Sequence, residues 1–194
     1  MDKSIITAIE RRFSESAAVL RLTAERLSGP LAKAAEMIVA AYRAGGGVFI
    51  FGNGGSAADA QHIACELVGR FLKERPALRA ESLCTDASVI TAVANDYDFS
   101  RVFARQLEGK AVAGDVAIAL STSGNSANVE AGLAVARKIG MKTIVFTGQG
   151  GGRCAALADI LLDVPCAGPS CRIQEAHTIM YHILCELVEN AIAG

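Results

Sequence analysis

Five short apolar runs alternate with segments of helical pattern, and this alternation is what most constrains the fold of the 194-residue chain. The runs cover residues 48–51, 80–84, 115–120, 143–147 and 160–164. Runs that are apolar at consecutive positions are typical of parallel strands covered on both faces. Helices are expected over residues 57–70, 87–95, 99–110, 126–139 and 171–193. We therefore predict an α/β fold, a three-layer αβα sandwich around a five-stranded parallel sheet.

The residues before the first apolar run have helical periodicity in two stretches. The first covers residues 3–28, and Ser28-Gly29-Pro30 is expected to end it. The second covers residues 31–44, before three consecutive glycines. We expect an N-terminal helical hairpin over residues 1–45, joined to an α/β sandwich over residues 46–194 in a single domain. Because 52% of the residues are hydrophobic, the hairpin is expected to pack on another copy of the chain in a homo-oligomer.

The charge balance and the hydropathy pattern exclude two classes of partner. Nineteen basic residues nearly match 20 acidic ones, so the chain has no basic excess with which to bind nucleic acid. No run of about 18 apolar residues occurs, which predicts no membrane-spanning helix. The first residues, MDKSIITAIERRF, lack the apolar block of a signal peptide. We expect a cytoplasmic protein with no nucleic acid and no membrane as partner.

The six cysteines include no CxxC pair, which argues against a cysteine-based zinc site. In a reducing compartment they are expected to be buried free thiols that pack as small apolar residues. They are Cys65, Cys84, Cys154, Cys166, Cys171 and Cys185.

Two turns rich in glycine and serine follow the first and third predicted strands. They are Gly52-Asn53-Gly54-Gly55-Ser56 and Ser121-Thr122-Ser123-Gly124-Asn125-Ser126. The carboxyl ends of parallel strands collect ligands, and glycine amides with hydroxyl groups suit an anion. Neither turn carries the lysine of a nucleotide triphosphatase, so a phosphate monoester fits better. The alternative is that the second turn only caps a helix, for which one serine would suffice.

The first turn also fits the dinucleotide pattern G-x-G-x-x-A over residues 52–57, with Asp86 as the acid that would bind ribose. The spacing to Asp86 exceeds the usual ~20 residues. A dinucleotide also leaves the second turn unexplained, so we expect no nucleotide cofactor.

His62 and Glu66 are four residues apart on a predicted helix and therefore share a face. That arrangement suits a divalent metal or a pair that transfers protons, and the alternative is a solvent-facing pair without chemistry. The last predicted helix contains RIQEAHTIMYH, with further polar candidates. These are Arg172, Gln174, Glu175, His177 and His182. His182 has apolar neighbours, so it is either a core histidine or a member of a site where two helices converge.

Four motifs in order carry a family resemblance: GNGGSAADAQHIACEL, TDASVITAVANDY, ALSTSGNSANV and RIQEAH with the later His182. Together they resemble the sugar isomerase (SIS) domain, whose fold is flavodoxin-like, and within it the phosphoheptose isomerases. The likeness runs from about residue 47 to the C-terminus. It implies conversion of sedoheptulose 7-phosphate to D-glycero-D-manno-heptose 7-phosphate for ADP-heptose and lipopolysaccharide precursors. It also implies a homotetramer with its site partly at a subunit interface.

The resemblance also implies roles for particular residues. Glu66 would be the base and His182 the acid of an enediol proton transfer. Zinc would be held by His62, Glu66, Gln174 and His182, although Gln174 and His182 lie ~12 Å apart along an ideal helix. Zinc would polarise the carbonyl. Substrate would contact Asn53, Gly54, Gly55, Ser56, Glu66, Asn95, Asp96, Ser121, Thr122, Ser123, Ser126 and Gln174.

Two other functions stay open at this point. A similar SIS protein is a non-catalytic adaptor that binds the bacterial replication initiator and lacks the catalytic glutamate and the final histidine. This chain has both Glu66 and His182, which favours the enzyme. A SIS isomerase of another phosphosugar is also compatible with the phosphate-binding turns.

Overall fold

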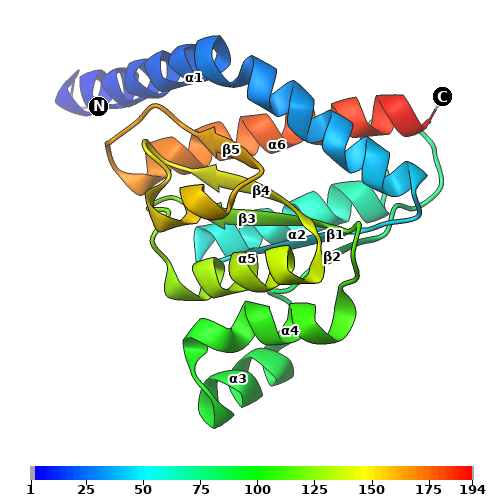
Figure 1. The fold of residues 1–194 in the computed structure, drawn as a ribbon. Helices are drawn as coiled ribbons and strands as arrows, with labels where there is room; N and C mark the ends of the chain where they lie inside the picture. Colours follow the sequence, from blue (N-terminus) through cyan, green and yellow to red (C-terminus); the bar gives the residue numbers. More distant parts are fainter. Residues whose placement is uncertain (1–2, 194) are drawn as a thin grey trace.

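The computed structural model describes residues 3–193, which form a three-layer αβα sandwich (Figure 1). The strands are β1 (Val48–Gly52), β2 (Ala80–Ser82), β3 (Val116–Ser121), β4 (Lys142–Thr147) and β5 (Ile160–Asp163). They are all parallel, in the order β2-β1-β3-β4-β5, which is the flavodoxin-like order. The predicted fold class and all five predicted strands are confirmed.

Helices cover both faces of the sheet (Figure 1). One face carries α1 (Lys3–Arg43), α2 (Gly55–Val68) and α6 (Ser170–Ile192). The opposite side carries α3 (Ala87–Asp96), α4 (Val102–Lys110) and α5 (Ala127–Ile139), with short 3-10 helices η1 (Phe99–Arg101) and η2 (Gly152–Leu157). The predicted helices after the first strand are therefore confirmed, except that residues 99–101 form a separate turn.

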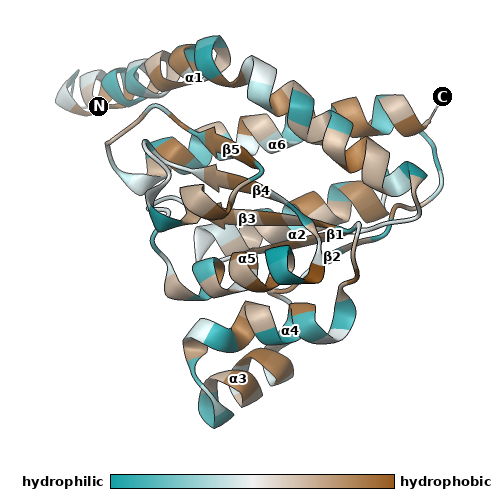
Figure 2. Cartoon of the chain, viewed as in Figure 1, coloured by the Kyte–Doolittle hydropathy of each residue, from teal (hydrophilic) through white to brown (hydrophobic). Residues whose placement is uncertain are grey.

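The strands are apolar at consecutive positions because each face of the sheet has its own core. Ile50 and Ile118 belong to the cluster beneath α1, α2 and α6, whereas their neighbours Phe51 and Ala119 belong to the other cluster. Every residue of β1 and β3 is buried. Figure 2 shows the sheet as the most hydrophobic part of the chain, with hydrophilic residues spread over the helices.

The predicted N-terminal hairpin is wrong, because residues 3–43 form one helix with Pro30 inside it. Figure 1 shows that this helix bends partway along its length. Proline lacks the N–H that would bond to the carbonyl four residues earlier, which explains a bend. The helix continues because Leu27 before the proline, and Leu31 and Ile38 after it, are buried in one core cluster. Residues 1–2 and 194 lie outside the described part of the chain.

All six cysteines are free, but they are not all buried. Cys154 and Cys185 are buried, and Cys84 and Cys166 are partly buried. The prediction is wrong for the exposed Cys65 and Cys171. On α2 the buried residues include Ala60, Ile63, Ala64 and Leu67, so Cys65 points away from the core side. Among residues 3–193, no helix is long and apolar enough to cross a membrane.

Candidate active site

The two predicted ligand turns lie side by side at one edge of the sheet. Strands β1 and β3 are neighbours, with Gly52 opposite Leu120, so the turns that follow them emerge together. The strand order reverses at this point, which is where ligands bind in open α/β sheets. Asn53 and Asn128 join the turns, because each amide nitrogen donates to the other side chain's oxygen at 2.8 Å. Asn128 was not predicted as a site residue.

The turn after β1 requires glycine for two separate reasons. Gly54 has a φ of 55°, which glycine adopts without strain. Gly55 is the first residue of α2, and a side chain there would collide with the amide of Gln174 from α6. The backbone of α2's first turn is therefore approached closely by a polar side chain from another helix. A cavity of about 140 Å³ lies beside this turn, between Asn53 and the Phe99 and Phe103 rings.

The turn after β3 brings four hydroxyl groups together, and two of them face each other. Ser121 Oγ and Ser126 Oγ lie 3.1 Å apart, and Ser123 Oγ accepts a hydrogen bond from the Asn125 amide at 3.1 Å. Thr122 donates to Ser170, at the start of α6, at 3.4 Å. Ser126 sits at the N-cap position of α5 but makes no side-chain capping bond. The helix-cap alternative therefore does not account for Ser126.

Three side chains that could bind a metal converge from α2 and α6. His62 Nε2 and Glu66 Oε1 lie 2.9 Å apart, one helical turn from each other on α2. The His182 ring from α6 lies 5.0 Å from the His62 ring, measured between centroids. One ligand atom from each of the three residues can be chosen so that all lie within 4.8 Å of one another. Packing of α6 on α2 thus places His182, which is half-buried, beside the predicted His62–Glu66 pair.

The remaining predicted residues lie elsewhere within the single chain. Gln174 contacts Gly55 at the start of α2, about 10 Å along that helix from His62 and about 12 Å along α6 from His182. Asn95 donates to Asp96 at 2.9 Å at the exposed end of α3. Gln174, the fourth predicted zinc ligand, therefore lies beside the first residue of α2. The other three predicted ligands cluster farther along α2.

Comparison with known proteins gives consistent matches along the chain. The SIS domain family model matches residues 13–148. The phosphoheptose isomerase of Desulfovibrio desulfuricans is 52% identical over 181 residues, which cover 93% of this chain and 80% of that protein. That of Aquifex aeolicus is 47% identical over 188 residues, covering 97% and 98%. The structure of the phosphoheptose isomerase from Neisseria gonorrhoeae has a TM-score of 0.90 at 38% identity, covering 96% of this chain and 99% of that chain.

The chain belongs to the phosphoheptose isomerase family. This confirms the resemblance that the four motifs indicated, and with it the SIS domain.

Behind His62 lie two further polar side chains, those of Tyr181 and Asp59, which sequence reasoning missed. The Tyr181 hydroxyl lies 3.0 Å from His62 Nδ1 and donates to Asp59 Oδ1 at 3.4 Å. A hydroxyl has one proton, so when it donates to Asp59 its oxygen can accept from the Nδ1–H of His62. That tautomer leaves the Nε2 lone pair free to bind a metal ion, whereas a hydrogen bond from Nε2 to Glu66 Oε1 requires the proton on Nε2. Burial raises the pKa of Asp59, and its second oxygen is buried without a hydrogen-bond partner.

His177, the histidine of the RIQEAH motif, is separate from the cluster of the other two histidines. It is fully buried, and its Nε2 donates to the Thr147 carbonyl at the end of β4, at 3.1 Å. Burial lowers its pKa to about 4, although the bond to the carbonyl opposes this shift. The ring is therefore neutral near pH 7, and it fixes α6 to the sheet.

Proposed function

We propose that this chain is a phosphoheptose isomerase that interconverts sedoheptulose 7-phosphate and D-glycero-D-manno-heptose 7-phosphate. The observation that carries the proposal is the convergence of His62, Glu66 and His182, in a chain 52% identical to a protein of that activity. The reaction moves a proton between C1 and C2 and needs no nucleotide cofactor. In the cell it would supply precursors of ADP-heptose and lipopolysaccharide in the cytoplasm.

The substrate phosphate is proposed to bind at the paired turns. The hydroxyls of Ser121, Ser123 and Ser126 supply donors, and the N-termini of α2 and α5 add positive ends of helix dipoles. The amide of Gln174 and the turn residues 53–56 would contact the sugar chain. Asn95 and Asp96 are proposed to contact the substrate's hydroxyl groups.

Glu66 and His182 divide the acid–base work in the proposed mechanism. The Glu66 carboxylate removes the proton bound to carbon, which leaves an enediol after the oxygens are protonated. His182 exchanges protons with those oxygens, because imidazole can act in both directions near neutral pH. Neighbouring rings restrict His182, since the Tyr181 and Phe71 ring centroids lie 4.9 Å and 5.8 Å from its own. Glu66, whose proton exchanges with solvent in the enediol state, then delivers a proton to the adjacent carbon, which completes the isomerisation.

The donor set fits a zinc ion held by His62, Glu66 and His182. Two imidazoles and a carboxylate are common zinc ligands, and the Tyr181–Asp59 pair would orient His62 as outer-shell groups orient metal-binding histidines. When bound, zinc would act as a Lewis acid on the substrate carbonyl. Gln174, the fourth predicted ligand, packs on Gly55 about 12 Å along α6 from His182, so we propose three ligands for the ion and a sugar contact for Gln174.

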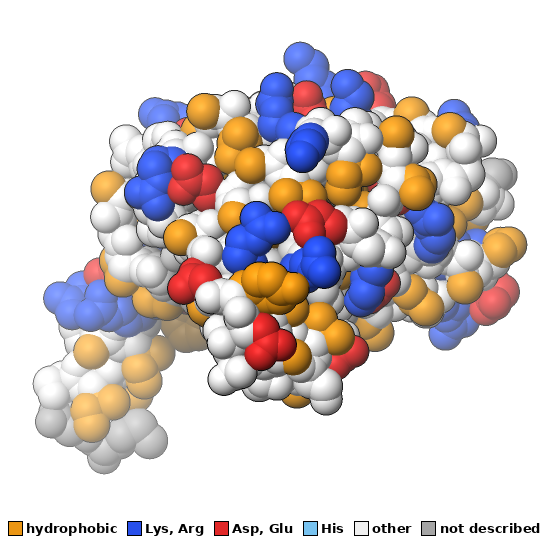
Figure 3. Space-filling view, turned by 60° about the horizontal axis from the view of Figure 1, so that its bottom comes forward, with side chains coloured by type: hydrophobic (Ala, Val, Ile, Leu, Met, Phe, Trp, Pro, Cys, Tyr) orange, Lys and Arg blue, Asp and Glu red, His pale blue; other side chains and the backbone are white. Residues whose placement is uncertain are grey.

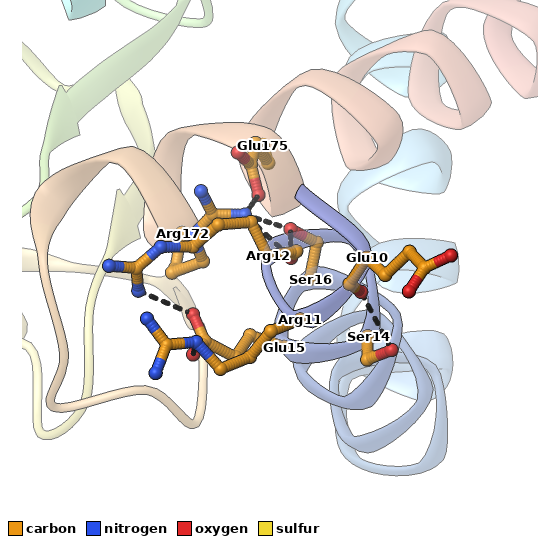
Figure 4. Close-up of polar contacts among 8 residues, drawn as sticks. All are labelled: Glu10, Arg11, Arg12, Ser14, Glu15, Ser16, Arg172 and Glu175. Atoms are coloured by element: carbon orange, nitrogen blue, oxygen red, sulfur yellow. Dashed lines mark hydrogen bonds and ion pairs between the residues drawn. The ribbon is translucent and has the colours of Figure 1, made fainter. Parts of the chain in front are cut away.

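A homotetramer is proposed, with the site completed between copies. Figure 3 shows the N-terminal end of α1 projecting from the body of the molecule, with hydrophobic side chains along it. Ile9 and Phe13 on this segment are 49% and 74% exposed, beside an apolar groove against Ile179 of α6. Figure 4 shows how Arg172 of α6 holds the segment through Ser16 while pairing with Glu175 at 2.7 Å. A helix held in place with its apolar side chains exposed is suited to packing on a second copy.

The alternative adaptor function is disfavoured by the retained catalytic groups. An adaptor that only binds a protein has no use for a glutamate and a histidine brought into one cluster with His62. An isomerase of another phosphosugar differs only in how the hydroxyl groups of the sugar are recognised, so a panel of substrates separates the two.

The deciding experiment is an NMR time course of the purified protein with sedoheptulose 7-phosphate, with and without a chelator. Appearance of the aldoheptose 7-phosphate supports the proposal, and loss of activity with the chelator, restored by zinc, supports the metal. Conversion of pentose or hexose phosphates alone would favour the other isomerase. No conversion of any of them, with zinc added, would contradict an isomerase function.

A further inference from the structure

A buried ion pair beyond the end of α2 has no part in the mechanism above. The Arg75 and Glu189 side chains are each 1% exposed, and Arg75 Nε lies 3.4 Å from Glu189 Oε1. Arg75 is in the segment that follows α2, and Glu189 is two turns after His182 on α6. Burying two charges costs free energy that a surface pair avoids, so such a pair needs compensating contacts.

The contacts of Glu189 hold the chain that follows α2. Its two carboxylate oxygens accept hydrogen bonds from three successive backbone amides, those of Phe71, Leu72 and Lys73, at 3.0, 2.7 and 2.8 Å. Burial opposes the charge of this carboxylate, but the three amides and Arg75 hold its pKa below the usual range. Glu189 thus holds residues 71–73 beside α6, and the Phe71 ring lies against the His182 ring.

The contacts of Arg75 hold the end of α2 itself. Its Nη2 donates to the backbone carbonyl of Glu66 at 2.7 Å, and its Nη1 donates to the carbonyls of Gly69 and Pro76 at 2.9 and 3.1 Å. The last carbonyls of a helix have no partner within the helix, so a guanidinium there replaces the missing donors. One of the carbonyls that Arg75 binds belongs to the residue proposed as the catalytic base.

We propose that Arg75 and Glu189 are positioning residues that fix the separation of Glu66 and His182. The pair joins the backbone of Glu66 on α2 to α6, the helix of His182, and sets the ring that lies against His182. The inference rests on the proposed function, because positioning is defined here for the isomerisation. The planar guanidinium spreads its donors over the Glu66 carbonyl, the Gly69 carbonyl and Glu189, whereas the compact ammonium of a lysine keeps the charge but not that spread of donors.

The test compares Arg75→Lys with the matched control Arg43→Lys. Arg43 is exposed and donates to a carbonyl at the end of α6, that of Ala191, and within residues 3–193 it makes no hydrogen bond or ion pair to α2 or to the segment after it. Both variants keep their charge. We expect Arg75→Lys to lower kcat about ten- to a hundredfold, the effect of displacing a reacting group by ~1 Å, with KM within about threefold. The phosphate turns lie at the other end of α2, so the substitution should leave binding of the substrate phosphate, and therefore KM, nearly unchanged. The control should keep both constants.

A folded Arg75→Lys protein with kcat within about twofold of wild type would overturn the proposal, as would a rise in KM alone. If Arg75→Lys does not fold, Glu189→Asp takes its place, because it keeps the buried charge and shortens the reach by one methylene. Amide exchange separates this inference from the proposed function. If the wild-type protein converts no sugar, the proposed function fails, and exchange at residues 66–73 decides whether the pair fixes this segment. Unchanged exchange in the variant would then refute the positioning role.

Discussion

Replacing His177 should remove a defined part of the protein's sensitivity to acid. An unfolded histidine has a pKa near 6.5, and burial lowers the pKa of His177 to about 4 in the folded chain. Between these values the unfolded state binds more protons, so the free energy of unfolding falls as the pH falls. The loss begins near pH 6.5 and is complete below about pH 4.

The size of the effect follows from the two pKa values. At pH 5 the unfolded histidine is almost fully protonated and the folded one is mostly neutral, which gives a loss of about 2 kcal/mol relative to pH 8. The full shift corresponds to about 3 kcal/mol. His177→Gln retains a side-chain N–H that can donate to the Thr147 carbonyl but cannot be protonated, so it should lack this loss.

The assay is urea unfolding at pH 8 and pH 5, at one protein concentration because association adds to apparent stability. Wild type should lose about 2 kcal/mol more than His177→Gln over this interval. His182→Gln, on the same helix, should retain the wild-type loss because His177 is intact. Equal losses in wild type and His177→Gln would refute the assignment of a buried, neutral His177.

Further predictions concern binding at the site. The double substitution Ser123→Ala with Ser126→Ala should raise KM for the sugar phosphate while kcat stays near wild type, because these hydroxyls hold the phosphate in the ground and transition states alike. Steady-state kinetics measures both constants. A loss confined to kcat would contradict this role. Asn128→Leu should weaken inorganic phosphate binding and destabilise the protein by about 1–3 kcal/mol, because it leaves the Asn53 amide without its partner, as calorimetry and urea unfolding would show. Tyr181→Phe should lower zinc affinity about 10- to 100-fold in competition with a chromophoric chelator, and an unchanged affinity would remove Tyr181 from the support of His62.

Local patterns in the sequence were enough to predict the sheet and two of the three residues in the His62–Glu66–His182 cluster. Consecutive apolar residues specify strands buried on both faces, which is why β1 and β3 were located within a residue or two. The spacing of His62 and Glu66 fixes their common face because helix geometry alone determines it. Such features depend on neighbours in the chain and therefore appear in the sequence.

Features that depend on packing between distant segments could not be predicted in the same way. The bond between Tyr181 and His62 joins residues 119 positions apart, and Glu189 binds amides 116 to 118 positions away. The hairpin prediction failed because a proline was treated as a helix end, whereas burial on both sides of Pro30 keeps the helix continuous. Gln174 matched a ligand motif, yet the parallel packing of α6 on α2 places it by Gly55.

The central claim is that Glu66 transfers the carbon-bound proton in an isomerisation. The most direct measurement is an NMR time course in D2O that compares wild type with Glu66→Gln, using sedoheptulose 7-phosphate at saturating concentration. Wild type should form the aldoheptose 7-phosphate with deuterium at C2, and Glu66→Gln should form none while still binding phosphate. Full turnover by Glu66→Gln, or no turnover by zinc-loaded wild type, would contradict the claim.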